Sequence, residues 1–286
     1  MTYWNVQKPY NQDKVSVGSI YFNAVRAVSI DTANIGLNNQ GEKVVPSGLF
    51  LAEVDGKVRF LPRDYARVAV TTADTQIEVS MPEIFLAGDD LYHLESEGLV
   101  TVAAGAAGDK VSIRFVDNAN GLNIGYTHVQ VGATTAELTA ELLTVLNDST
   151  NPLSEYARFE SDTDGEIKVF SSGAIYDIVA SAEGTATATA TTQLDTATKF
   201  IGRVASVDFA NNLLTLEAAA AVEFGEGARI GTNVDQVYGL YNHSKDFTQM
   251  LFCDLKAIER CDRVYKSGLP YFDTQLALQF PNMNFV

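Results

Sequence analysis

The chain has 286 residues, with 20 lysines and arginines against 36 aspartates and glutamates, which gives a net charge of −16. Proteins that bind nucleic acids present a basic face to the phosphates, so this excess of acid excludes direct binding to DNA or RNA. No stretch has the ~18–20 consecutive apolar residues that span a bilayer, and the N-terminus lacks the apolar core of a signal peptide. We therefore predict a globular protein of about two domains, made in the cytoplasm and without a membrane partner.

The first part of the chain is rich in strand signals. We assign residues 1–18 to an N-terminal arm and residues 19–97 to the first part of a host β domain. Apolar and polar residues alternate over 49–61 on both sides of Asp55 and Gly56, a dipeptide that supplies the positive φ angles of a tight type I′ turn. This pattern predicts a β-hairpin, followed by further short strands.

The composition changes at residue 98, where alanine, glycine and threonine become frequent. Within residues 98–198, Thr134 and Glu137 have the spacing of a capping box, which predicts the start of a helix. A hairpin is predicted around Asp164 and Gly165. The segment holds 13 acidic and four basic residues. We therefore predict a small, inserted, acidic α+β domain that faces solvent.

From residue 199 the earlier strand pattern resumes, with a predicted hairpin that has Asn211 and Asn212 at its tip. Residues 199–247 are therefore predicted to be the second part of the host domain. A chain can leave and re-enter a sheet in this way because the entropy cost of closing a loop grows only with the logarithm of its length. The predicted fold class is mainly β, with a host that is a short-stranded sandwich or barrel-like.

Residues 248–286 have a different character. The apolar spacing between positions 248 and 261 predicts a C-terminal helix, and an extended aromatic tail follows it. Cys253 and Cys261 would lie two turns apart on this helix, too far for a disulfide, so both are predicted to be buried thiols.

Half of the aromatic side chains lie near the two ends of the chain. Of 28 aromatic residues, five fall in the first 22 positions and nine fall between Tyr238 and Phe285. In one interpretation, both ends complete the host core. In the other, both are arms that dock on neighbouring subunits, because aromatic residues are enriched in the cores of interfaces. The candidate partner-binding residues are Tyr3, Trp4, Tyr10, Tyr271, Phe272 and Phe280.

The sequence contains no motif that predicts catalysis, a metal site or a cofactor. The three histidines are far apart: His93, His128 and His243. The glycine-rich stretch 225–231 has one residue too many for a dinucleotide fingerprint, and the stretch 105–110 is too short for a phosphate-binding loop. Residues 162–166 resemble half of a calcium loop but lack its later glutamate, so we interpret them as a hairpin turn. We predict a protein that is not an enzyme.

Two hairpins resemble those of a known family. Residues 45–52, followed by Asp-Gly-Lys-Val at 55–58, resemble a hairpin of the head decoration (cement) proteins of tailed bacteriophages. Residues 201–208 and 213–216 are similar to a second hairpin of such capsid accessory proteins. The insert is similar to small domains of phage head and tail proteins, so the resemblance covers roughly two thirds of the chain. The aromatic C-terminal segment matches no part of it.

The resemblance implies a structural virion protein that binds the outer surface of an icosahedral phage capsid and cements the lattice of the major capsid protein. It implies a dimer or trimer made in the host cytoplasm and located on the virion, with residues 1–18 as an arm that adds a strand to the shell. One alternative is another phage component, such as a tail tube, baseplate or head fibre protein. Others are a polysaccharide hydrolase, which needs paired carboxylates beside aromatic platforms, and a bacterial adhesion module, which the missing export signal disfavours.

Overall fold

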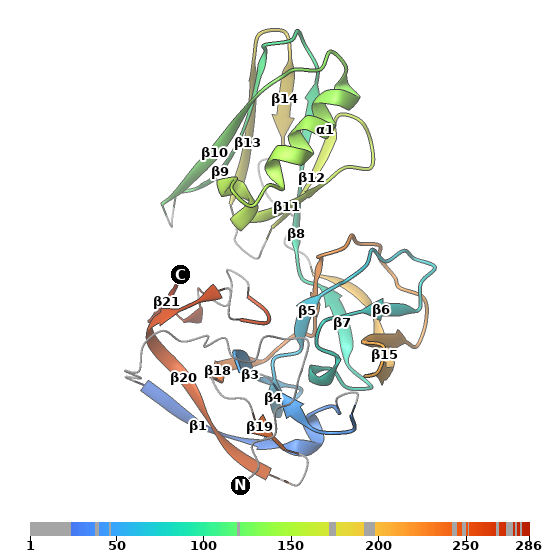
Figure 1. The fold of residues 1–286 in the computed structure, drawn as a ribbon, viewed down its shortest axis with the longest axis vertical. Coiled ribbons are helices and arrows are strands. Elements are labelled where there is room, and N and C mark those ends of the chain that lie inside the picture. Colours follow the sequence, from blue (N-terminus) through green and yellow to red (C-terminus); the bar gives the residue numbers. More distant parts are fainter. Residues whose placement is uncertain are drawn as a thin grey trace. The chain divides into compact units, whose positions relative to one another are not determined.

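The computed structural model describes residues 24–37, 40–45, 47–118, 121–171, 176–191, 198–241, 245–247, 250, 252–266, 269–272, 277, 279, 280 and 282–286. These residues form a mainly β structure with mostly antiparallel sheets (Figure 1). The chain divides into two compact units. Unit 1 combines Met1–His93 with Lys199–Val286, and unit 2 is Leu94–Thr198. The predicted arm at residues 1–18 lies outside the described residues.

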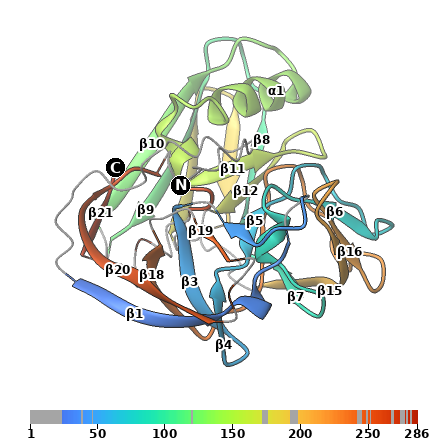
Figure 2. The same cartoon turned by 60° about the horizontal axis from the view of Figure 1, so that its bottom comes forward.

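The first sheet of unit 1 contains strands from both ends of the chain. Its order is β1 (Ala24–Asp31), β20 (Phe252–Val264), β18 (Gln236–Tyr241), β3 (Leu49–Val54) and β4 (Lys57–Phe60), and β21 (Met283–Phe285) runs parallel to β20. Strands β1 and β20 lie side by side in both views (Figure 1 and Figure 2). The predicted hairpin is confirmed, because β3 pairs with β4 across Asp55 and Gly56, whose φ angles are 51° and 70°.

The second sheet of unit 1 curls back on itself. Its order is β5 (Arg63–Tyr65), β17 (Arg229–Gly231), β7 (Asp90–His93), β15 (Lys199–Asp208), β16 (Leu213–Leu216) and β6 (Gln76–Glu78). A bridge between Ala66 and Val79 joins the two outer strands, which gives the sheet a barrel-like form. The predicted hairpin with Asn212 at its tip is confirmed in β15 and β16.

Smaller elements also lie among the described residues of unit 1. Strand β2 (Val44–Val45) pairs with β19 (Lys245–Asp246), and two short 3-10 helices are η1 (Thr32–Asn34) and η2 (Pro82–Ile84). Buried apolar side chains from both sheets belong to one continuous core.

The predicted C-terminal helix at 248–261 is wrong, because residues from Phe252 to the end of this segment belong to the long strand β20. Cys253, Leu255 and Ala257 occupy alternate positions and all pack in the core of unit 1, as residues on one face of a strand do. Strand β20 pairs with β1, β18 and β21, and these distant partners override the helical spacing of its apolar residues. Cys253 is half-buried on this strand instead of fully buried on a helix.

A fully buried carboxylate fixes β5 to the turn that follows β6. Asp64 accepts hydrogen bonds from the backbone N–H groups of Tyr65 (2.8 Å), Ser80 (2.7 Å) and Met81 (2.6 Å). Burial, which disfavours the charged form, raises the pKa of Asp64 to about 7, although these three donors act in the opposite direction. Asp64 is therefore a structural residue of unit 1.

A buried ion pair joins the two sheets of unit 1. Both terminal nitrogens of Arg59 on β4 donate to the carboxylate of Asp89 at 2.7 Å, and one of them also donates to the carbonyl of Ile84. The same carboxylate accepts the backbone N–H of Leu86 at 2.8 Å. This network connects β4 of the first sheet to the segment that enters β7 of the second.

Unit 2 has two sheets and one described α-helix around its own core. One sheet has the order β11 (Ala157–Glu160), β12 (Glu166–Ser171), β8 (Ser96–Ala103) and β14 (Thr187–Ala190). The other has the order β10 (Leu122–Val129), β9 (Lys110–Asp117) and β13 (Asp177–Glu183). The 3-10 helix η3 (Pro152–Glu155) precedes β11, and the predicted hairpin at Gly165 is confirmed in β11 and β12.

The predicted capping-box helix is confirmed as α1 (Thr135–Leu146). Thr134 is its N-cap, and the reciprocal hydrogen bonds between Thr134 and Glu137 are both present. Leu138, Leu142 and Leu146 are buried one turn apart, so a single apolar face of α1 packs against β8, β11 and β12.

Candidate functional site

Three uncharged segments lie at the same end of unit 2. They are residues 104–108, 129–134 and 184–186, and together they are called the tip. The strand ladders bring them together, because Lys110 pairs with Val129 and Glu183, while Ala103 pairs with Thr187. Strand β8 enters unit 2 at its opposite end, so the tip is the end away from the chain connections to unit 1.

Gln130 ties two of these segments together. Its side chain is 1% exposed and pairs with the backbone of Gly105, donating to the carbonyl at 3.2 Å and accepting from the N–H at 3.1 Å. It also donates to the carbonyl of Gly132 at 2.6 Å. Its backbone N–H donates to the carbonyl of Asp109 (2.8 Å), and its own carbonyl accepts from Gly108 (2.9 Å). The connection from β10 to α1 therefore has a single anchor in the interior.

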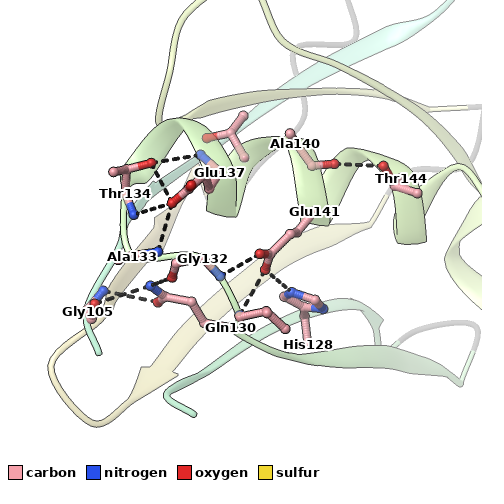
Figure 3. Close-up of polar contacts among 12 residues, drawn as sticks. Gly105, His128, Gln130, Gly132, Ala133, Thr134, Glu137, Ala140, Glu141 and Thr144 are labelled. Carbon is pink, nitrogen blue, oxygen red and sulfur yellow. Dashed lines mark hydrogen bonds and ion pairs between the residues drawn. The ribbon is translucent and has the colours of Figure 1, made fainter. Parts of the chain in front are cut away.

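Two glutamates of α1 hold the rest of this connection. Figure 3 shows Glu141 pointing from α1 to the backbone, where it accepts from Val131 N–H at 3.1 Å and Gly132 N–H at 2.6 Å. Glu137 accepts from the N–H groups of Ala133 (2.8 Å) and Thr134 (3.0 Å). With Gln130 bonded to Asp109, all five N–H groups from 130 to 134 have partners, so the backbone of this connection is fixed.

A histidine completes the network. Nε2 of His128 lies 2.8 Å from a carboxylate oxygen of Glu141 (Figure 3). The contact with His128, together with the two backbone donors, holds the pKa of Glu141 below its usual range, and bonding to Thr134 does the same for Glu137. Both carboxylates therefore remain charged at neutral pH, when they stabilise the connection.

The fixed backbone displays two apolar side chains to solvent. Val131 is 75% exposed and Val129 is 50% exposed. The charged residues beside them, Lys110 and Glu183, form an ion pair with each other at 3.0 Å. Because its polar groups are engaged internally and its exposed side chains are chemically inert, this arrangement is suited to contact with another surface.

The other motifs singled out in the sequence are structural. His93 is buried and stacks on Phe224, with 5.8 Å between ring centroids. Residues 225–231 lead into strand β17, and Gly108 closes a turn before β9. Asp162 of the calcium-like loop pairs with Lys168. Within the described parts of the chain, no group of three or more His, Cys, Asp or Glu residues could hold a metal ion. His243 lies outside those parts.

The predicted partner-binding residues at the C-terminal end pack in unit 1. Tyr271 and Phe280 are buried, at 5.2 Å from the ring of Tyr65 and 5.6 Å from that of Phe50, respectively. Phe272 is half-buried, and its ring lies 5.1 Å from that of Phe285. The described tail therefore completes the host core, as in the first of the two interpretations above, and leaves little of Tyr271 or Phe280 for a partner.

The predicted residues at the N-terminal end are Tyr3, Trp4 and Tyr10, and these lie outside the described residues. Their contact with a partner stays a prediction. The tip residues were not predicted from the sequence. The capping box locates the start of α1, and hence a short connection before it, but no local signal marks Val131 as exposed or Gln130 as buried.

A scan against protein-family models and a search of curated proteins find no match to this chain. Among the described residues, no helix is long and apolar enough to cross a membrane.

Acid should release the tip. In the folded protein, the pKa of Glu141 lies below its ordinary value of 4.5. The ionised carboxylate therefore stabilises the fold above pH 4.5, and this stabilisation is lost as the pH falls through the lowered pKa. We expect the NMR signals of the Val131 and Gly132 amides to shift together with a midpoint below 4.5, and Glu141→Gln to remove this transition. A midpoint at or above the ordinary value would show that the carboxylate does not hold the loop.

Proposed function

We propose that this protein is a structural component of a tailed-phage virion, which binds the outer surface of the capsid and stabilises the lattice of the major capsid protein. The observation that carries the proposal is the division of the chain into two compact units. Unit 1 is a β host interrupted by a second compact unit, and that second unit ends in a tip whose backbone is fixed by hydrogen bonds. Both hairpins that resemble decoration proteins lie in unit 1, as β3–β4 and β15–β16.

The charge and architecture suit this role. A protein that coats a shell in many copies must stay soluble before it binds, and a net charge of −16 keeps free molecules apart. Many weak contacts around a symmetric lattice then add up to stable attachment. Buried polar side chains such as Arg59 and Asp64 join segments of unit 1, which suits this unit to the role of a support.

Binding to capsids tests the proposal directly. Purified protein added to expanded, undecorated capsids is expected to bind saturably and to raise the temperature at which the capsids break. Absence of binding would contradict the proposal, as would closed hexameric rings in mass photometry, which indicate a tail-tube protein.

The N-terminal arm is the expected anchor. Deleting residues 1–14, or changing Tyr3, Trp4 and Tyr10 to alanine, should abolish capsid binding and leave thermal unfolding of the free protein unchanged, because an arm adds no core. Phe200→Ala is the matched control, since it removes an exposed aromatic side chain from unit 1. If capsid binding survives the deletion, the arm is not the anchor.

A further inference from the structure

We propose that Asp55, in the turn of the β3–β4 hairpin, is a site of covalent self-modification at which aspartate isomerises to isoaspartate. The backbone nitrogen of Gly56 attacks Cγ of the Asp55 carboxyl group, and the hydroxyl of that group leaves with the amide proton as water. The resulting succinimide ring then takes up one water molecule at the Asp55 carbonyl, which breaks the bond from that carbonyl to the Gly56 nitrogen. Afterwards the main chain runs through Cβ and Cγ of Asp55. The reaction needs no co-reactant other than water.

The chain offers an internal comparison, because it contains two Asp–Gly pairs, 55–56 and 164–165. A glycine after the aspartate favours ring closure, since no side chain shields its nitrogen and its backbone rotates freely. Both pairs lie in hairpin turns, and both glycines have positive φ angles, 70° at Gly56 and 86° at Gly165. The two pairs share the same reacting groups, so a difference in rate between them in the folded protein reports their surroundings.

The Gly56 nitrogen is accessible to the carboxyl group. Asp55 and Gly56 are both exposed, and a Cβ placed on Gly56 would meet no atom within 4 Å. The Gly56 N–H faces a carboxylate oxygen of Asp235 at 3.4 Å, which is longer than the ~2.7–3.2 Å of an ordinary hydrogen bond. Asp55 has a φ angle of 51°, in the left-handed region where Cβ of an L-residue is crowded. Among the described residues, neither packing around Gly56 nor a short hydrogen bond from its N–H opposes the rotation that closes the ring.

The Gly165 nitrogen, in contrast, is held in the interior of unit 2. Gly165 is buried, and its N–H donates to Oγ1 of Thr139 on α1 at 2.9 Å. Its carbonyl accepts from the N–H of Val102 on β8 at 2.7 Å, and a Cβ placed on Gly165 would lie 2.8 Å from the Val102 carbonyl oxygen. Ring closure at Asp164 would break the bond to Thr139, because the nitrogen loses its proton. A buried hydrogen bond that is lost on the way to the ring slows the reaction about tenfold.

Isomerisation at Asp55 should weaken the hairpin. Isoaspartate adds one carbon atom to the main chain within a two-residue turn, so the pairing of Val54 with Lys57 across this turn is no longer kept. Arg59 follows on the same strand, β4, and makes the buried ion pair with Asp89. Isomerised molecules should therefore unfold at a lower urea concentration than unmodified ones. The inference is independent of the proposed function, because every step takes place in the free protein.

Peptide mapping of the folded full chain tests the inference. The protein is incubated in mildly acidic buffer and digested, and the peptides that contain residues 55 and 164 are separated and fragmented to distinguish isoaspartate from aspartate, which has the same mass. We expect isoaspartate at 55 to form at least about tenfold faster than at 164. In denaturant the two rates should converge, because the hydrogen bond from Gly165 to Thr139 is then absent.

Asp55→Asn and Asp164→Asn are the matched variants. Asn-Gly is a preferred pair in type I′ turns, so Asp55→Asn is expected to keep the β3–β4 hairpin. The succinimide then forms with loss of ammonia instead of water, and deamidation at 55 should exceed deamidation at 164 by the same factor. Equal rates at the two positions in the folded protein, or isoaspartate at 55 only after denaturation, would overturn the inference.

Discussion

Asp64→Ala is expected to lower the free energy of unfolding by about 3 kcal/mol or more. The Asp64 carboxylate is fully buried and accepts from three backbone N–H groups, those of Tyr65, Ser80 and Met81. Alanine would leave these donors without an acceptor in the interior. Chemical denaturation followed by circular dichroism measures the loss. Asp90→Ala, which removes an exposed carboxylate from β7 of the same sheet, is the control and should change little.

The contribution of Asp64 to the free energy of unfolding should also depend on pH. Because the pKa of Asp64 is raised from 3.8 to about 7, the folded state binds a proton more tightly than the unfolded state. Relative to Asp64→Asn, the wild type should be most stable below about pH 4 and should lose on the order of 4 kcal/mol as the pH rises to about 7. A difference between the two proteins that is constant over this range would show that Asp64 is already ionised at low pH.

Asp89→Ala is the second change with a large expected effect, a loss of about 3–5 kcal/mol of unfolding free energy. It would leave the Arg59 guanidinium charged and buried without its bidentate partner, and it would remove the acceptor of Leu86 N–H. Because this ion pair joins the two sheets of unit 1, the Asp89→Ala variant should also begin to unfold at a lower urea concentration than the wild type.

A double variant separates the ion pair from simple packing. Arg59→Met combined with Asp89→Leu should cost less than Asp89→Ala alone, since no charge is left buried. If Arg59→Met and Asp89→Leu each lower the free energy of unfolding by no more than about 1 kcal/mol, the ion pair behaves like one exposed to solvent and does not hold the sheets together.

The local features of the fold could be predicted from the sequence. The turn at Asp55 and Gly56 was recognised because positive φ angles restrict the choice of residues to very few types. The start of α1 was recognised because Thr134 and Glu137 satisfy each other three residues apart. Both signals lie within a few residues, so no knowledge of tertiary contacts was needed.

The features that depend on distant contacts could not be predicted. Strand β20 has apolar residues at helical spacing, and it is a strand because β1, more than 200 positions earlier in the chain, pairs with it residue by residue. The same limit applies to the candidate site. The interior position of Gln130 depends on Gly105, and the exposure of Val131 depends on Glu141. The spacing of apolar and polar residues in the sequence does not indicate such contacts between distant residues.

A cryo-EM map of expanded capsids incubated with the purified protein would show whether the protein binds the outer surface of the shell. We expect additional density on the outer surface of the shell, with unit 1 against the major capsid protein. Capsids without additional density after incubation with saturating protein would contradict the proposed function.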